Sequence, residues 1–320
     1  MRGRLYDAGG RDRDVDVSAA VVSGLKKDQL LWIDVDSRDA ARFDSVVAAL
    51  DIPDQTAERV LEEVGRAGLI RYKAAIHLTV ETIEANEAGD DGFVRRELDI
   101  FARWNVVVTV HDGPVEALET FKEQLRGDTL IGKLDAGAFL EAIVDTGLTT
   151  WFAHVEEIER EIDELDELAV EAHDADRFLT GVVRLRRRVA RLRRTVAPHR
   201  EALAPLARTD LALDEVLGHT LPNLEVRLDR VIDALENVRE QLVGSFDIYL
   251  GRTAQRTNDV MKILTVLSAV LLPSVVLAGV MGMNFKLDFF EQASNFWLVI
   301  GGMAAMAIAI LALARARRWI

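Results

Sequence analysis

The chain has 320 residues, of which 49% are hydrophobic and 29% charged, and this composition excludes a disordered or collagen-like protein. It contains no cysteine, so disulfides, thiolate zinc sites and cysteine nucleophiles are excluded. The formal net charge of −14 argues against a nucleic-acid-binding protein, which needs a basic surface.

Residues 1–130 are predicted to form an α/β domain. Apolar, β-branched runs predict strands near 30–35, 73–82, 97–103 and 105–111. Helical patterns lie near 38–50, 55–66 and 114–126. Strands that alternate with helices in this way predict a small α/β layer.

Residues 131–222 are predicted to be wholly helical. Residues 155–171 are strongly acidic, and residues 182–200 contain eight arginines. The arginines could contact phosphate or nucleic acid. We favour the simpler interpretation that the two amphipathic helices fold back on each other and pair their charges.

Residues 223–262 are predicted to form a stalk helix. Its apolar positions follow a heptad spacing, and they are Leu224, Leu228, Val231, Leu235, Val238, Leu242, Phe246 and Tyr249. No proline interrupts the pattern, so the helix is expected to run directly into the next segment. A helix of this length is not expected to bury its stripe within one small domain, and we therefore infer a homo-oligomer.

Two apolar segments follow, at 263–285 and 296–315, which carry no charge before Arg315, and each is long enough to cross a bilayer. Two buried helices of a soluble core are the alternative. The segments are joined by a loop at 286–295, and a basic tail follows at 316–320. Basic residues flank the two outer ends, which predicts a multi-pass protein of the cell membrane with both termini in the cytoplasm.

The heptad spacing continues into the first span and predicts one uncharged helix face. Its members are Asn258, Met261, Thr265, Ser268, Leu272, Val275, Gly279 and Gly282. Around an axis, this face would be polar at the inner mouth and hydrophobic in the middle, and apolar rings can gate a pore by dewetting. Ordinary helix packing without a pore explains the same spacing equally well.

The first span ends in Gly282-Met283-Asn284, and here the chain resembles the CorA family of divalent-cation transporters. Asn258, Met261-Lys262, Leu264-Thr265, Pro273 and Gly279 precede this tripeptide at the family's spacing, and Phe285 follows it. Asp247-Ile248-Tyr249-Leu250 in the stalk also resembles the family. The similarity is close over residues 245–285, and elsewhere it lies in the order of the elements.

The resemblance implies a funnel-shaped homopentamer with one central pore. Gly282, Met283 and Asn284 would form the selectivity motif, with five Asn284 amides binding Mg²⁺ through its waters. Met261, Leu264 and Leu272 would form hydrophobic constrictions, and Asn258 a polar inner ring. Asp288 and Glu291 in the loop would attract cations.

The resemblance also implies that the channel takes up Mg²⁺, with Co²⁺ and Ni²⁺ as further substrates, and that cytosolic Mg²⁺ closes it. Glu225, Asp229 and Asp233 are candidates for the regulatory metal site, although such charges also occur on solvated helix faces. No cofactor is expected besides Mg²⁺ as substrate and regulator. The expected partners are further copies of the chain, the lipid bilayer and divalent cations, and no nucleic acid.

Two other functions stay open. A proton-coupled zinc transporter of the related branch would share much of this architecture, and a non-conducting membrane anchor would use the stalk for assembly alone. An enzyme is not expected, because the sequence shows no nucleophile–base constellation. The six histidines show no metal-ligand spacing and are interpreted as structural or surface residues: His77, His111, His154, His173, His199 and His219.

Overall fold

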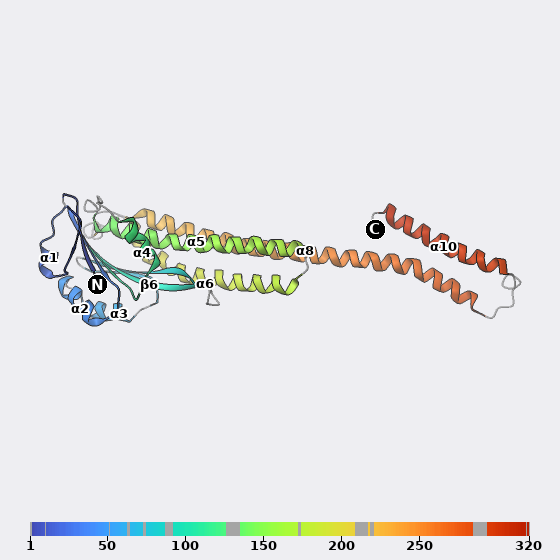
Figure 1. Ribbon diagram of the computed structural model, residues 1–320, viewed down its shortest axis with the longest axis horizontal. Coiled ribbons are helices and arrows are strands. Elements are labelled where there is room, and N and C mark those ends of the chain that lie inside the picture. The colour runs from blue at the N-terminus through green and yellow to red at the C-terminus, as the bar shows by residue number, and fades with distance from the viewer. Residues whose placement is uncertain are drawn as a thin grey trace. The chain divides into compact units, whose positions relative to one another are not determined.

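Figure 1 shows the computed structural model of the chain. The described residues are 2–9, 11–50, 52–62, 65–72, 75–86, 92–125, 135–171, 174–208, 217, 221–283, 293–317 and 319. The chain divides into two compact units. The first contains Met1–Leu165 and Asp176–Ser245, and the second contains Asp166–Ala175 and Phe246–Ile320.

The first unit contains a seven-stranded sheet in the order β2-β1-β3-β7-β6-β5-β4. Only β3 and β7 pair in parallel among the described strands. The α/β fold predicted for this region is confirmed, and the sheet is larger than expected. Its strands are β1 (Arg2–Asp7), β2 (Arg13–Val15), β3 (Gln29–Val35), β4 (Gly68–Arg71), β5 (Ile76–Asn86), β6 (Gly92–Arg103) and β7 (Val106–Val110).

Helices cover both faces of this sheet. The helices α1 (Ala19–Ser23), α2 (Ala40–Leu50) and α3 (Asp54–Leu61) contribute to one apolar core with strands β3 and β7. On the other face, α4 (Glu116–Gln124) and α5 (Ala136–Glu171) add Phe121 and Phe139, which pack edge-on against Trp32. The helix predicted at 55–66 is shorter and covers Asp54–Leu61; beyond it, Gly65 has a φ of +63°, a conformation that glycine adopts readily.

Helices α5 and α6 (Ala175–Ala207) carry the acidic and basic segments, and ion pairs join the two helices. Arg188 contacts Glu157 at 2.5 Å and Glu161 at 2.7 Å, and Arg184 contacts Glu161 at 2.6 Å. The prediction that these helices pair their charges is therefore confirmed for these two arginines. The sheet holds α6 through His199, whose Nε2 accepts a hydrogen bond from the Glu81 backbone amide at 2.9 Å.

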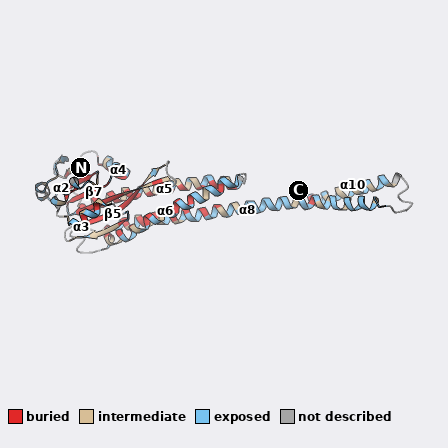
Figure 2. Cartoon of the chain, turned by 90° about the horizontal axis from the view of Figure 1, so that it is seen from below, coloured by how far each residue is buried: buried red, intermediate tan, exposed pale blue. Residues whose placement is uncertain are grey.

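The predicted stalk and first span form one helix, α8 (Pro222–Met281), and α10 (Ala293–Ala316) contains the second span. The expected continuity of the long helix is confirmed. The reason given for an oligomer is wrong for the first part of the stripe, because these side chains are already buried within one chain (Figure 2). Six heptad positions are no more than 5% exposed: Leu224, Leu228, Val231, Leu235, Val238 and Leu242.

Candidate functional site

The later part of α8 and all of α10 expose long apolar surfaces. Both helices are long and apolar enough to cross a membrane, and in their most apolar 18-residue windows only 6% and 0% of the residues are buried. Ile263, Leu272 and Val275 are 62–65% exposed. Such a surface is stable only when lipid or other protein covers it. These exposed helices are therefore the candidate site, and the alternative of a soluble core is wrong.

The predicted pore-lining residues lie along one face of α8. At about 3.6 residues per turn, Asn258, Met261, Thr265 and Ser268 follow one another every three or four residues. Leu272, Val275 and Gly279 extend the same row. Leu264 borders it. Every member is exposed except Ser268, which is partly covered. No acidic or basic side chain interrupts this row, which we call the uncharged face.

The returning helix leaves the uncharged face open. Helices α8 and α10 run side by side in the second unit (Figures 1 and 2). Val266 and Ala314 are each only 7% exposed, whereas Leu272 and Val275 on the uncharged face stay open. Gly301 and Gly302 have the small size that permits close helix approach, but a Cβ added at either glycine would meet no atom within 4 Å. The part of the uncharged face around Leu272 and Val275 is thus free for further copies of α8.

Polar atoms on the uncharged face are partly satisfied by the helix itself. The Thr265 hydroxyl donates to the Met261 carbonyl at 2.7 Å, which leaves the lone pairs of its oxygen free to accept. Beside this face, Lys262 pairs with Asp259 at 2.8 Å. The pair neutralises both charges near the predicted inner mouth, so the polarity there comes from the Asn258 amide and the Thr265 hydroxyl.

The outer end of α8 carries the predicted selectivity motif. The helix ends at Met281, and the Gly282 amide still donates to the Ala278 carbonyl at 3.0 Å. Gly282 stands where a C-cap glycine would, but its φ lies outside the left-handed region, so that role is not supported. Met283 is 55% exposed. Asn284, Asp288 and Glu291 lie outside the described residues.

A cavity of about 530 Å³ lies at the inner end of the first span. Asn258, Met261 and Thr265 line it, together with Trp319 from the C-terminal tail. The tail residue is held in a turn, because its amide donates to the Ala314 carbonyl at 2.9 Å. The sequence interpretation missed Trp319, although a tryptophan beside a basic cluster is a common signal for a membrane-interface residue.

The three candidate regulatory residues lie at the start of α8. Glu225, Asp229 and Asp233 are spaced four residues apart and so share one side of the helix. Asp229 pairs with Arg200 at 2.9 Å, which neutralises its charge within the chain. Among the described residues, no group of three histidine, aspartate or glutamate side chains could hold a metal ion.

Buried ionisable groups in the first unit have internal partners. Burial raises the pKa of Asp34, but the hydrogen bond and charge of His111, with bonds from Lys122 and Thr109, lower it to about 2. Burial raises the pKa of Glu81 to about 7, and burial lowers the pKa of His199 to about 4. Asp34 on β3 contacts Lys122 on α4, and the backbone amide of Glu81 on β5 contacts His199 on α6. Both contacts join a strand to a helix, which is a structural role.

The histidines follow the same pattern. His77 contacts Asp99 at 2.6 Å, His111 contacts Asp34 at 3.1 Å, and His154 Nδ1 lies 2.9 Å from the Thr150 carbonyl. All three side chains are buried. The structural interpretation fits them, while His173 and His219 lie outside the described residues.

Comparison with known proteins gives consistent matches. The family model of the CorA-like Mg²⁺ transporter protein matches residues 27–315. The cobalt/magnesium transport protein CorA of Thermotoga maritima is 27% identical over 228 residues, which cover 68% of this chain but only 62% of that protein. The protein of the same name from Methanocaldococcus jannaschii is 23% identical over 305 residues, 91% of this chain and 92% of that one.

A solved structure shares the fold. The complete structure of the CorA magnesium transporter from Methanocaldococcus jannaschii matches with a TM-score of 0.70 at 18% identity, and the match covers 100% of this chain and 99% of that chain. The order of sheet, helical hairpin, long helix and second apolar helix is therefore the order of a known fold.

Proposed function

We propose that this chain, which belongs to the CorA-like Mg²⁺ transporter family, assembles into a homopentameric membrane channel that takes up Mg²⁺. Co²⁺ is a further substrate in the proposal, because two relatives are named cobalt/magnesium transport proteins, and Ni²⁺ is included on chemical similarity. The observation that carries the proposal is the uncharged, exposed face of α8, which runs through a membrane-length apolar segment to Gly282-Met283-Asn284.

The proposed ion path follows this face from outside to inside. A ring of Asn284 amides binds the hydrated ion, which suits Mg²⁺ because this ion dehydrates reluctantly. Rings of Leu272, Leu264 and Met261 form the dry constriction, and Asn258 gives a polar exit. The absence of a charged group on this path permits release, which conduction requires.

The membrane potential supplies the driving force. The basic residues before the first span and after the second support a cytoplasmic location of the first unit and both termini. A doubly charged ion that moves inward through the cell membrane gains roughly 4.6 kcal/mol per 100 mV, twice the value for a single charge. Uptake then needs no fuel site. Cytosolic Mg²⁺ closes the channel through acidic sites of the first unit, with Glu225 and Asp233 as candidates.

Ion flux into liposomes tests this proposal. The full chain and Asn284→Ala are reconstituted at equal density, and Mg²⁺ entry is followed with an internal indicator dye. We expect Asn284→Ala to abolish most of the Mg²⁺ flux without loss of the oligomer. Asn223→Ala is the matched control, because Asn223 is an exposed amide on the same helix far outside the span. Equal flux in all three proteins would remove Asn284 from the selectivity role.

A further inference from the structure

The basic helix α6 contains a seven-residue repeat that the proposed transport does not use. Residues 183–189 read VRLRRRV and residues 190–196 read ARLRRTV. In both repeats the leucine and the final valine are buried. The first position, Val183 or Ala190, lies on the opposite side of the helix and is exposed. The repeat therefore builds a row of small side chains on the outer face, with arginines along both sides.

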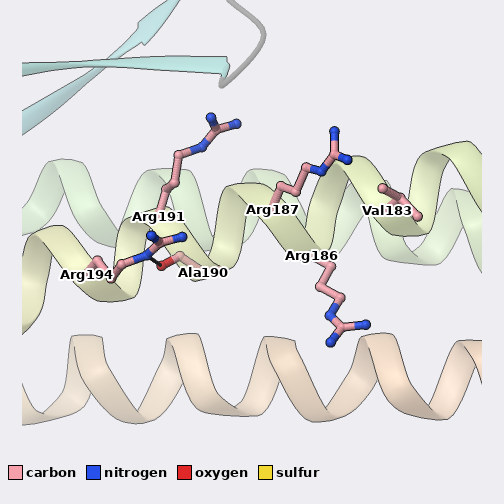
Figure 3. Close-up of a pocket in the computed structure, with 6 residues that line it drawn as sticks. All are labelled: Val183, Arg186, Arg187, Ala190, Arg191 and Arg194. Atoms are coloured by element: carbon pink, nitrogen blue, oxygen red, sulfur yellow. Dashed lines mark hydrogen bonds between the residues drawn. The ribbon is translucent and has the colours of Figure 1, made fainter.

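Five residues of this outer face and one bordering arginine line a shallow groove of about 350 Å³. Figure 3 shows that Arg187 and Arg191 extend to one side of the helix and Arg186 to the other. The complete lining, which we call the arginine groove, is Val183, Arg186, Arg187, Ala190, Arg191 and Arg194. It contains no acidic side chain.

Three of the four arginines of the arginine groove have no ionic partner within the described part of the chain. Arg184 and Arg188 point toward α5 and pair with its glutamates, whereas Arg186, Arg187 and Arg194 make no ion pair with any described residue. Like charges one turn apart on a helix repel each other. An external anionic group would relieve this repulsion.

Helix α5 carries the complementary surface. Its exposed side includes Glu156, Asp163 and Glu164, and none of them pairs with a basic residue among those described. Arg160 is the one exposed cation between them. The hairpin thus presents an acidic outer face on one helix and a basic outer face on the other.

We propose that the arginine groove of one copy docks on the acidic outer face of α5 in a neighbouring copy. A ring of identical copies joins two different surfaces of each subunit, so surfaces of opposite charge on the two helices of one hairpin satisfy this requirement. The inference rests on the homo-oligomer of the proposed function. The groove also suits a helix better than a small anion, because its lining from Val183 to Arg194 extends about 17 Å along α6.

Disulfide cross-linking tests the contact, since the natural chain has no cysteine. Two differently tagged full-length forms, Ala190→Cys and Asp163→Cys, are co-expressed, purified through both tags and oxidised. Docking brings their Cα atoms within the roughly 7 Å that a disulfide spans. We expect a two-copy band from the mixed oligomer and none from either single form alone. Both positions are exposed, so the substitutions leave the core intact.

Charge reversal adds a specific control. In the Ala190→Cys copy, the double change Arg187→Glu and Arg194→Glu is expected to lower the yield of mixed dimer about tenfold. The double change Glu156→Arg and Glu164→Arg in the other copy is expected to restore the yield. Arg59→Glu reverses an exposed arginine elsewhere and is expected to change nothing.

Three results would overturn this docking. The first is a multi-copy particle without the mixed dimer, which leaves the proposed channel intact, whereas a monomeric particle would contradict the channel as well. The second is an equal dimer yield from the Ala190→Cys form alone. The third is that tripolyphosphate binding depends on Arg187 and Arg194 while the yield of mixed dimer does not depend on them. The groove would then be an anion site.

Discussion

Arg188 holds the helical hairpin together, and its replacement is expected to destabilise the protein. The side chain is 6% exposed and reaches two carboxylates, Glu157 at 2.5 Å and Glu161 at 2.7 Å. Loss of one partner of a fully buried pair costs about 3–5 kcal/mol. The two carboxylates are 40% and 22% exposed, so water recovers part of this energy. We expect Arg188→Ala to cost about 2 kcal/mol.

Arg184 provides the matched control one turn earlier on α6. It also pairs with Glu161, at 2.6 Å, but its side chain is 63% exposed. Arg184→Ala should therefore cost at most about 0.5 kcal/mol. Thermal unfolding of the full chain in detergent measures both, and about 2 kcal/mol corresponds to a midpoint roughly 4–8 °C lower. Equal midpoints for the two variants would refute the argument that burial decides the energy of these ion pairs.

Three further predictions concern buried carboxyls and the constriction. Burial raises the pKa of Glu81 from 4.5 to about 7, so the folded state loses stability as the pH rises across this range. Glu81→Gln should therefore stabilise the protein by about 2 kcal/mol at pH 8 and by little at pH 4. Urea unfolding at the two pH values measures this difference. Asp34 has its pKa lowered from 3.8 to about 2, so Asp34→Asn should cost about 2 kcal/mol at pH 7, and this cost should vanish as pH falls toward 2. Leu272→Ser should wet the proposed constriction and raise Mg²⁺ flux at high internal Mg²⁺, and unchanged flux would exclude Leu272 from the gate.

Periodicity and hydropathy predicted the helical parts well for a physical reason. The heptad stripe and the uncharged apolar run follow each other without a break, and both specify a helix through local spacing alone. The result is the single helix Pro222–Met281. The same spacing could not say what covers the stripe. Leu228 and Leu235 are buried within the chain, whereas Leu272 and Val275 remain exposed.

The sheet was harder to predict because its edge strands β2 and β4, and β1 next to β2, carry little apolar signal. Strand β1, Arg2–Asp7, contains two arginines and an aspartate, and β2 and β4 have only three and four residues. Strands β1 and β2 pair across a short connection, as do β4 and β5, and this pairing defines these strands more than their own residues do. Trp319 was missed for a similar reason, since its contact with the inner end of the first span arises only when the second helix returns.

The charge pattern of the hairpin was predicted only in part. Opposite charges on consecutive helices correctly indicated that α5 and α6 pair, as Arg188 and Glu161 show. Sequence alone did not indicate that the pairing uses one side of α6, because the side of each arginine depends on which residues of the helix are buried.

Imaging of the purified full-length particle by electron cryo-microscopy tests the central proposal most directly, because the proposal needs several copies of α8 around one axis. We expect five copies whose uncharged faces, from Asn258 to Gly279, enclose a continuous central passage. A monomeric particle, or an oligomer in which these faces point into lipid and no passage exists, would contradict it.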